Sequence, residues 1–433
     1  MSENRRHVIL VDTYETASHG VPQTARHIAP AFRRAGVDCV RVQSSPQPPA
    51  VYRSASPTLE NYSANIVHDG DLAETVRALR PYRPVAVVAG GEYGVAFADV
   101  LGEALGLPGN GTELSRARRD KAAMAEAVRA AGLRTARQLR AETESELVEW
   151  HAKLGGRIVV KPLSSAGGDG VAFCDTPEES AAAFRRIVGS DDIFSVPNAA
   201  VLAQEYLVGT EYIVNTASLD GRHHAAEIWR SARLSVNGIR DLSGGCYLVP
   251  REGEVQDRLV EYSFGVLDAL GVRHGPAHVE LKMTPEGPCL IEAGSRLSGA
   301  DLPHYASLAA GESQLDWAVD SYVRPKRFAA RRGQPYTIDQ FFAWVPLISP
   351  VAGRLKKLRH TDDIRALESF REMWELARPG AEIRQTVDDT TYPAIINLMH
   401  AVEEVVLRDM ETIRYLDGVG LYELDGSADT GPA

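Results

Sequence analysis

Residues 277–299 carry the sequence AHVELKMTPEGPCLIEAGSRLSG. Apolar and polar residues alternate on both sides of a turn at 284–287 (TPEG), which predicts two antiparallel strands over 277–283 and 288–293. Successive side chains of a strand point to opposite faces, so one face of this hairpin is expected to be apolar. The residues expected on that face are Val279, Leu281 and Ile291.

Two carboxylates face each other on the predicted hairpin. With the turn centred on Glu286, Glu280 and Glu292 stand directly opposite. Facing residues have Cβ atoms about 4.5–5.5 Å apart, and like charges there destabilise a sheet. The pair therefore suggests a shared divalent cation, and Mg²⁺ typically takes a few carboxylates together with phosphate oxygens. The alternatives are a turn shifted by one residue, or a solvated face on which Lys282 or His278 offsets the charge.

Arg296 follows the hairpin in the run Glu-Ala-Gly-Ser-Arg-Leu-Ser-Gly that starts at Glu292. A guanidinium is a planar fork of donors that suits a transferring phosphoryl group or a carboxylate. An arginine beside a carboxylate pair is therefore a candidate for the same site. The alternative is a surface ion pair, which is the usual role of an arginine.

A glycine-rich loop at 164–170 (SSAGGDG) follows a predicted strand over 157–161 that ends in Lys161. Glycines let the backbone present N–H groups to an anion, serine hydroxyls add donors, and a lysine adds a point charge for a phosphate. The alternative is a plain hairpin turn, and no GxxxxGK[ST] motif occurs, so this is not a P-loop. Since it contains no apolar anchor, we expect the loop to become ordered only over a nucleotide.

The N-terminal region predicts a parallel α/β domain over 1–110. Strands are expected at 8–12, 37–42 and 84–89, with helical stretches between them. No GxGxxG motif follows any of these strands, so the sequence lacks a dinucleotide-binding fingerprint.

Further elements are expected along the rest of the chain. One helix is predicted over 115–131 and another over 144–154, the second capped by Thr143. A glycine-containing loop is predicted at 242–247, and strands mix with helices over 335–425.

Composition excludes several classes of partner. The 433 residues are 44% hydrophobic and 24% charged, ordinary globular values for about three domains. The net charge of −11 argues against nucleic acid or an anionic membrane as the main partner. No apolar run reaches membrane length, and the cysteines form no CxxC pair, so we expect a cytoplasmic protein without a disulfide framework or structural zinc.

Taken in order, these motifs resemble the ATP-grasp superfamily of carboxylate–amine ligases. The motifs that carry the resemblance, which covers 85–330 closely, are Arg119-Asp120-Lys121, Val160-Lys161-Pro162 with the glycine loop, Gln204-Glu205-Tyr206-Leu207 followed by Gly209-Thr210-Glu211, His278-Val279-Glu280, and Ile291-Glu292-x-x-x-Arg296. The resemblance implies an α/β chain with the ATP-grasp fold. Its expected parts are an N-terminal parallel α/β domain at 1–110, central ATP-grasp lobes at 111–200 and 201–333, a mixed α+β domain at 334–423 packed on that core, and a disordered tail at 424–433.

The resemblance also implies a role for each matching residue. Lys121 and Lys161 would hold the ATP phosphates, and Glu211 would bind the ribose hydroxyls. Glu280 and Glu292 would hold Mg²⁺, with Mn²⁺ able to replace it. The remaining residues implied at the ATP site are Ser164, Ser165, Gly167, Gly168 and Gly170 over the phosphates, and Glu205, Tyr206 and Leu207 at the adenine. Arg296 and the Gly299 backbone would steady the acyl phosphate and the tetrahedral intermediate, and the residues implied near the substrates are Glu92, His278 and Ser298.

Two stretches, Gly91-Glu92 to Asn110 and Arg296-Leu297-Ser298-Gly299, resemble the L-amino-acid ligases, bacilysin-synthetase-like enzymes of specialised metabolism. The expected activity is ATP-dependent amide formation from a small carboxylate and an amine, with release of ADP and phosphate, by a homodimer. The alternatives are an ATP-grasp ligase with a thiol acceptor or carboxylase-like chemistry, and a nucleotide-binding protein without catalysis. One position departs from the pattern: many relatives have an Asn metal ligand two residues after the second Glu, where this chain has Gly294.

Overall fold

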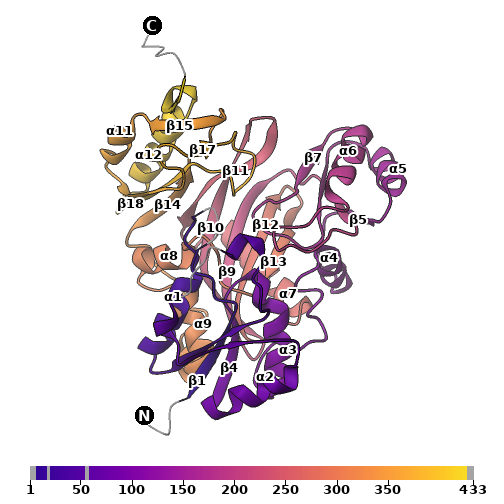
Figure 1. Cartoon of the computed structure of the whole chain (residues 1–433), viewed down its shortest axis with the longest axis vertical. Coiled ribbons are helices and arrows are strands. Elements are labelled where there is room, and N and C mark those ends of the chain that lie inside the picture. The colour runs from indigo at the N-terminus through magenta and orange to yellow at the C-terminus, as the bar shows by residue number, and fades with distance from the viewer. Residues whose placement is uncertain (1–5, 17–19, 54–57, 427–433) are drawn as a thin grey trace. The chain divides into compact units, whose positions relative to one another are not determined.

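The computed structural model describes residues 6–16, 20–53 and 58–426 (Figure 1). The chain divides into two compact units. Among the described residues, the first unit comprises 6–16, 22–53, 58–228 and 250–337, and the second comprises 20–21, 229–249 and 338–426. All the site residues predicted from the sequence belong to the first unit.

A parallel sheet with strand order β3–β2–β1–β4 forms the N-terminal part of the first unit. Its strands are β1 (His7–Val11), β2 (Asp38–Gln43), β3 (Ala64–Val67) and β4 (Pro84–Ala89). The inner strand β1 is almost wholly buried, as a continuous apolar run between two parallel neighbours requires. Helices α1 (Ala25–Arg34), α2 (Leu72–Leu79) and α3 (Val95–Leu105) alternate with the strands (Figure 1). The predicted parallel α/β domain is therefore confirmed.

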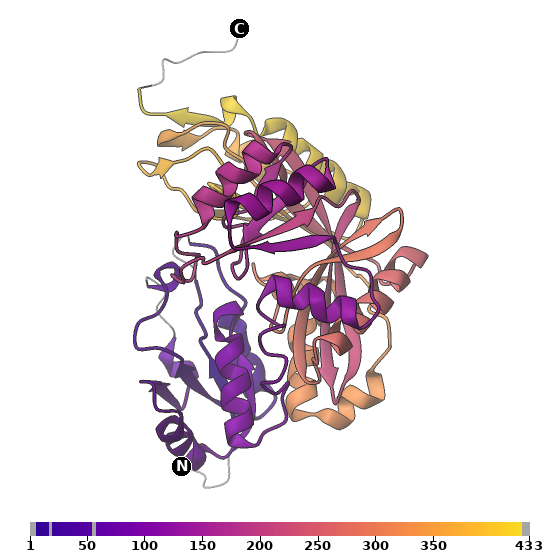
Figure 2. The same cartoon turned by 90° about the vertical axis from the view of Figure 1, so that its right-hand side faces the viewer.

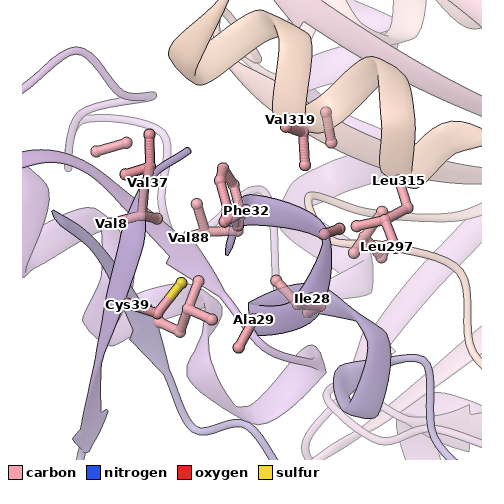
Figure 3. Packing of buried hydrophobic residues seen from close by; sticks show 14 of the residues in the cluster. Val8, Ile28, Ala29, Phe32, Val37, Cys39, Val88, Leu297, Leu315 and Val319 are labelled. Atoms are coloured by element: carbon pink, nitrogen blue, oxygen red, sulfur yellow. The ribbon is translucent and has the colours of Figure 1, made fainter. Parts of the chain in front are cut away.

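A hydrophobic core joins this sheet, helix α1 and helix α9 (Gln314–Val323), as Figure 3 shows. The residues labelled there from these elements are Val8, Ile28, Ala29, Phe32, Cys39, Val88, Leu315 and Val319. Leu297 belongs to the same core and directly follows Arg296. Because side chains in a core are close-packed, this cluster fixes one end of the segment that carries Arg296.

An antiparallel sheet with the order β5–β8–β6–β7 carries the glycine loop. Its strands are β5 (Gln138–Ala141), β8 (Val201–Glu205), β6 (Ile158–Pro162) and β7 (Ala172–Cys174), and the loop connects β6 to β7. Helices α5 (Glu144–Leu154) and α6 (Pro177–Ile187) lie side by side in both views (Figures 1 and 2). The predicted helix over 144–154 is confirmed together with its cap, because Thr143 and Glu146 form a capping box.

The helix predicted over 115–131 begins later than expected. Helix α4 spans Lys121–Ala130, and the residues before it form turns. Asp120 is the N-cap, whose side chain accepts hydrogen bonds from the N–H groups of Ala122 and Ala123. This cap places Lys121 at the first position of the helix and leaves Arg119 outside it.

A second antiparallel arrangement in the first unit carries the carboxylate pair. Its strand order is β13–β12–β9–β10, formed by β13 (Gly287–Gly294), β12 (Gly275–Thr284), β9 (Thr210–Leu219) and residues 222–228 of β10 (Arg222–Val236). The helices of this part are α7 (Glu254–Ala269), α8 (Leu302–Ala310), α9 and α10 (Pro325–Arg331). Since β12 is paired on both sides, the backbone position of Glu280 is fixed by two neighbouring strands.

The predicted hairpin is present, but its turn is not centred on Glu286. Thr284 pairs with Gly287, so the centre lies between residues 285 and 286. Continued without interruption, this register would place Ile291, rather than Glu292, opposite Glu280.

A β-bulge restores the predicted pair. The register shifts between Glu280 and Leu281, and Glu280 pairs with Glu292. Ile291 is the extra residue of the bulge. It is half-buried, whereas Val279 and Leu281 are fully buried, so two of the three residues expected on the apolar face are in the core.

The second unit mixes strands and helices, as the sequence over 335–425 predicts. Residues 229–236 of β10 are followed in strand order by β11 (Ile239–Val249), β14 (Phe341–Pro346), β18 (Ala394–His400) and β16 (Phe370–Glu375). A smaller sheet contains β17 (Glu382–Ile383), β15 (Gly353–Leu358) and β19 (Tyr422–Leu424). The helices are α11 (Thr361–Arg365) and α12 (Glu403–Leu416), and α12 contacts β14 and β18.

The loop predicted at 242–247 is wrong, because these residues lie in strand β11. Cys246 pairs with Trp344 of β14. Gly245 has a φ of +119°, and a Cβ on it would lie 2.3 Å from the carbonyl oxygen of Trp344. Glycine here permits close approach of two strands rather than a turn.

In the described part of the chain, no helix combines the length and apolar character needed to cross a membrane. All four cysteines are free thiols and are buried. The predicted disordered tail lies outside the described residues from 427 onward, and Leu424 ends strand β19.

Candidate active site

Glu280 and Glu292 lie opposite each other on β12 and β13. Their side chains keep 29% and 25% of their surface exposed, so both carboxylates remain accessible to a ligand. Each also has a partner: His278 Nε2 lies 2.9 Å from Glu280 Oε1, and Lys121 Nζ lies 3.1 Å from Glu292 Oε1. These contacts hold the two carboxylates in place in the free protein.

Lys121 links the carboxylate pair to the glycine loop. Besides its ion pair with Glu292, its Nζ donates to the carbonyl oxygen of Ser165 at 2.9 Å. The backbone N–H of Lys121 donates to the carbonyl oxygen of Leu163, which precedes the loop. The structure therefore brings together Lys121, the glycine loop and Glu292, of which the resemblance assigned the first two to the ATP phosphates and the third to Mg²⁺.

Lys161 is buried on β6. The charges of nearby lysine and glutamate side chains affect its pKa. Burial lowers its pKa to about 8, with a further contribution from the positive charge of Lys121. Glu292, Glu280 and Glu211 act in the opposite direction without cancelling these effects. A buried lysine beside a second lysine favours an anionic ligand, because an anion stabilises both ammonium groups.

The glycine loop has a backbone that requires glycine. Gly167, Gly168 and Gly170 have φ values of +66°, +74° and +70°, the left-handed region that other residues rarely adopt. Within the loop, Ser165 Oγ donates to Asp169 Oδ2 at 2.7 Å. Ser164, at its start, approaches the carbonyl oxygen of Arg119 at 3.4 Å.

The loop does have an apolar anchor, contrary to expectation. Ala166 packs against a cluster that contains Val51 and Phe194. Asp169 Oδ2 also accepts a hydrogen bond from the N–H of Ile193 at 3.0 Å. The anchor could not be found from the loop's own sequence, because it is supplied by segments distant from it along the chain.

The segment predicted to meet adenine connects β8 to β9. The ring of Tyr206 lies beneath two cations, with Arg157 Cζ 5.1 Å and Lys282 Nζ 5.0 Å from its centroid. Lys282 Nζ also donates to the carbonyl oxygen of Leu207 at 3.2 Å. The contacts of Arg157 and Lys282 with Tyr206 and Leu207 hold this segment in place.

Glu205 is the first residue of this segment, and Glu211 follows the segment on β9. Glu205 forms an ion pair with Arg137, whose Nε lies 2.5 Å from Glu205 Oε2. Glu211 is buried on β9, directly opposite Lys282 of β12. Its contact with a ribose stays a prediction.

Glu92 forms a cluster with two arginines. Arg296 Nε donates to Glu92 Oε2 at 2.9 Å, and Arg119 donates both to Glu92 Oε1 and, at 2.6 Å, to the Glu92 carbonyl oxygen. Burial would raise the pKa of Glu92, but the positive charges of Arg119 and Arg296 outweigh burial and lower it. Glu92 is therefore an ionised carboxylate that orients Arg296. Arg119, which the sequence motif included without a role, completes the cluster.

This cluster explains why position 294 departs from the family pattern. A Cβ at Gly294 would lie 2.8 Å from Glu92 Oε2. The Glu92 carboxylate thus occupies the space in which an asparagine side chain would begin, so glycine at 294 accommodates the contact between Glu92 and Arg296.

Ser298 and Gly299 follow Arg296 in the loop before α8. The N–H of Ser298 donates to Gln314 Oε1 at 2.8 Å, and its carbonyl oxygen accepts from Thr24 Oγ1 at 2.5 Å. The buried Ser298 hydroxyl has no hydrogen-bond partner among the described residues. No atom lies within 4 Å of a Cβ added at Gly299, so open space adjoins the loop there.

Three buried polar residues near His278 were missed from the sequence. They are Asn215 on β9, Glu227 on β10 and Gln314 on α9. A usable signal was present, since Asn215 interrupts the strand YIVNTASL and Glu227 interrupts AAEIW. A polar residue within a buried strand has to find a partner.

The donor set of the carboxylate pair fits Mg²⁺. Among the described residues, no three His, Cys, Asp or Glu side chains gather into a site that could hold a metal alone. Mg²⁺ does not need such a site, since it is usually bound by one or two carboxylates, waters and substrate phosphates. Two accessible carboxylates beside two buried lysines meet that description.

Comparison with known proteins agrees with this geometry. Residues 154–303 match the family described as "ATP-grasp domain". The chain is 32% identical over 360 residues to dapdiamide A synthase of Enterobacter agglomerans, which covers 82% of each chain. It is 22% identical over 297 residues to alanine–anticapsin ligase of Bacillus subtilis (strain 168), covering 59% of this chain and 63% of the relative.

A solved structure has the same fold. The L-amino acid ligase from Bacillus licheniformis superposes with a TM-score of 0.73 at 18% identity, covering 98% of this chain and 100% of that one. Another solved structure with this fold, the biotin carboxylase domain of the Hydrogenobacter thermophilus 2-oxoglutarate carboxylase, contains the magnesium salt of ADP; it has a TM-score of 0.62 at 14% identity and covers 97% of this chain and 90% of that one. With the 32% identity that extends over four-fifths of both chains, these findings show that the chain belongs to the ATP-grasp family of ATP-dependent ligases that form C–N bonds.

Proposed function

We propose that this ligase activates the carboxylate of an amino acid or a related small acid as an acyl phosphate and couples it to an amine. The products are an amide or dipeptide, ADP and phosphate. The observation that carries the proposal is the position of Lys121, which contacts both the glycine loop and Glu292. This contact supports a single site in which the proposed phosphate-binding residues adjoin the proposed Mg²⁺ ligands. The kinship with dapdiamide A synthase supports a role in specialised metabolism.

The chain's own residues account for the first half-reaction. A carboxylate oxygen of the substrate attacks the γ-phosphorus of ATP, and the bond to the bridging oxygen of ADP breaks. Lys121 and Lys161 hold the phosphates, and the loop 164–170 covers them and excludes water. A Mg²⁺ ion held by Glu280 and Glu292 would neutralise charge on the transferring phosphoryl group.

The second half-reaction depends on Arg296. The amine attacks the acyl carbon and an oxyanion forms. The bond between the acyl carbon and the phosphate oxygen then breaks, and the proton lost by the nitrogen passes to the departing phosphate or to solvent. Arg296 Nε is held by Glu92 at 2.9 Å and one terminal nitrogen by the Leu297 carbonyl oxygen at 3.0 Å. In the part of the chain that the structure describes, no further acceptor is bonded to the Arg296 guanidinium, so its other N–H groups can bind the oxyanion and the departing phosphate.

A product screen tests the proposal. The protein is incubated with ATP, Mg²⁺ and a matrix of amino acids and small carboxylates, and ADP release is coupled to mass spectrometry. Amide products that appear together with ADP support it. ADP release with a thioester or carboxylated product would instead favour a ligase with another acceptor. Absence of ATP binding would contradict both kinds of ligase.

Removing either lysine is expected to weaken ATP binding. A charge-assisted hydrogen bond contributes about 1.5–3 kcal/mol, so Lys121→Ala and Lys161→Ala should each raise the Kd for ATP roughly tenfold to a hundredfold. Calorimetry measures this directly, with Lys153→Ala on the exposed face of α5 as a control. Unchanged affinity in both site variants contradicts the phosphate site.

ATP affinity is also expected to fall as the pH rises through about 8. The pKa of Lys161 is lowered to about 8, so this lysine is charged below that pH and neutral above it. Loss of the charge weakens binding by up to about tenfold per pH unit, until the pKa of the ATP-bound state is reached. Lys161→Met should bind ATP weakly with a flat profile over the same range, and an identical profile in both proteins contradicts the assignment.

Nucleotide is expected to protect the glycine loop from proteolysis. Because Ala166 is anchored on the cluster with Phe194, the free enzyme should show partial protection, and ATP should slow cleavage at 164–170 several-fold further. Phe194→Ala should speed cleavage only in the free enzyme. Equal cleavage rates with and without ATP argue against closure of the loop over phosphates.

We further propose that the protein acts in the cytoplasm as a homodimer on small molecules. The buried free thiols of all four cysteines suit a reducing compartment. Light scattering of the purified protein measures the oligomeric state.

A further inference from the structure

A buried chain of hydrogen bonds runs from His278 to Ser298. It passes through Asn215, Glu227 and Gln314, whose exposed fractions are 0%, 1% and 0%. Asn215 lies on β9, Glu227 on β10 and Gln314 on α9, whereas the lysines proposed to bind phosphate lie on α4 and β6. This chain of hydrogen bonds nevertheless ends at the proposed reaction centre in both directions. His278 contacts Glu280, and Ser298 lies between Arg296 and Gly299.

The first half of the chain orients His278. Asn215 Nδ2 donates to Glu227 Oε1 at 2.7 Å, and Asn215 Oδ1 lies 2.8 Å from His278 Nδ1. A carboxylate only accepts hydrogen bonds, so Glu227 fixes which end of the Asn215 amide faces the ring. The other ring nitrogen, Nε2, then lies 2.9 Å from Glu280 Oε1. The ring thereby connects a buried carboxylate to a proposed metal ligand.

The second half fixes the loop that carries Arg296. Glu227 Oε2 accepts from the N–H of Gln314 at 3.3 Å, and Gln314 Oε1 accepts from the N–H of Ser298 at 2.8 Å. Gln314 Nε2 donates to two carbonyl oxygens, those of Thr216 and Ala277, at 3.1 and 2.8 Å. The Gln314 amide is therefore satisfied on both ends, and it holds the backbone between Arg296 and Gly299.

We propose that Asn215, Glu227 and Gln314 are positioning residues, which hold the Glu280 carboxylate and the Arg296–Gly299 loop in one fixed geometry. The physical reason is directional: hydrogen bonds between buried groups set orientation, which apolar packing of the same volume does not. Phosphoryl and acyl transfer lose rate steeply when reacting groups shift by an ångström. The proposal rests on the proposed function, since it assigns these residues to that reaction.

Glu227→Gln tests the centre of the chain. The substituted amide has nearly the same shape, but one of its two ends is a donor, so it opposes either Asn215 Nδ2 or the N–H of Gln314. Residues that orient metal ligands typically contribute 10- to 100-fold. We expect kcat to fall by about that factor, the Mg²⁺ concentration for half-maximal rate to rise, and the Kd for ATP to stay within about twofold.

Two further variants test the two halves of the hydrogen-bond chain separately. Asn215→Leu disconnects only the His278 half, so the Mg²⁺ requirement should rise. Gln314→Met disconnects only the loop half, so kcat should fall at saturating Mg²⁺ while the Mg²⁺ requirement is unchanged. A residue that only stabilised the fold would not separate these two parameters.

A measurement on the enzyme without metal or nucleotide completes the test. In ¹⁵N-histidine NMR spectra, the His278 ring signals, assigned with His278→Gln, should shift in Asn215→Leu and Glu227→Gln but not in Gln314→Met. This readout decides the ring's orientation even if the wild-type protein makes no amide product, in which case the proposed function alone fails.

The matched control is Asp320→Asn. Asp320 is a buried carboxylate on the same helix α9, and it pairs with Arg327 of α10, whose Nε lies 3.2 Å away. This variant should lower the Tm while kcat and the Mg²⁺ requirement stay at wild-type values. Wild-type kcat, wild-type Mg²⁺ requirement and unshifted ring signals in Glu227→Gln would overturn the proposal. If that variant does not fold, wild-type behaviour of both Asn215→Leu and Gln314→Met would overturn it equally.

Discussion

Glu280→Gln and Glu292→Gln are each expected to abolish ADP formation while leaving the protein folded. Glutamine keeps the shape of the side chain but replaces an anionic oxygen by a neutral amide, which is a poor Mg²⁺ ligand. Loss of an electrostatic contribution to a reaction centre costs on the order of 10²–10³ in rate. The fold should persist, because the backbone of the hairpin is held by the pairing of β12 with β13, which neither substitution changes.

The measurement is ADP release over a range of Mg²⁺ concentrations, with the Tm of each variant as a check on folding. Glu286→Gln is the control on the same hairpin, since Glu286 is an exposed turn residue, 68% accessible, that pairs with Arg134. Surface pairs of this kind contribute little, so the control should be silent. If both site variants keep near-wild-type turnover at limiting Mg²⁺, the carboxylate pair is not the metal site.

Arg296→Lys is expected to bind ATP normally and form product about 10²–10³-fold more slowly. Lysine keeps the charge but loses the planar fork. In the structure, Arg296 Nε contacts the Glu92 carboxylate and one terminal nitrogen contacts the Leu297 carbonyl oxygen. One ammonium group cannot keep these contacts and also reach an oxyanion. An interaction made mainly in the transition state lowers kcat rather than raising KM when it is removed.

Single-turnover measurement of product formation decides this prediction. Arg129→Lys on α4 is the control, because Arg129 forms an exposed ion pair with Glu126 in which 66% of its side chain is accessible. A near-wild-type rate in Arg296→Lys would remove Arg296 from the catalytic residues and leave it a structural partner of Glu92.

Much of the site was predictable because its signals are local in the sequence. Glycine at 167, 168 and 170 is required by positive φ angles in a short turn. Asp120 caps the helix that begins at Lys121 through contacts within three residues, a local signal that the predicted start at 115 overlooked. Such features depend on neighbouring residues only, so a sequence pattern is sufficient to find them.

Glu280 and Glu292 face each other as predicted, but a β-bulge, rather than a turn centred on Glu286, brings them opposite each other. The hairpin turn is not centred on Glu286, and the bulge at Ile291 corrects the difference. A period-two pattern cannot show a bulge, because the extra residue is accommodated by packing of the sheet.

Other parts of the site came only from the tertiary structure. Glu92 and Arg296 are 204 residues apart and meet through the packing of the first unit. Glycine at position 294 is explained by Glu92, whose carboxylate occupies the space that a Cβ at this position would need. The strand that replaces the predicted loop at 242–247 likewise depends on a partner strand almost a hundred residues away.

The sequence by itself determined most of the secondary-structure elements, the glycine loop and the identity of the two facing carboxylates. These follow from propensity, periodicity and short motifs, which act between near neighbours. The phosphate-binding role of Lys121 and Lys161, in contrast, was implied by the family resemblance and stays a prediction. The tertiary structure decided how Arg296 is oriented, what anchors the loop through Ala166, and that Asn215, Glu227 and Gln314 join the two halves of the site. The physical reason is that a buried polar group must find its partner in space, and the distance along the chain sets no limit on where that partner lies.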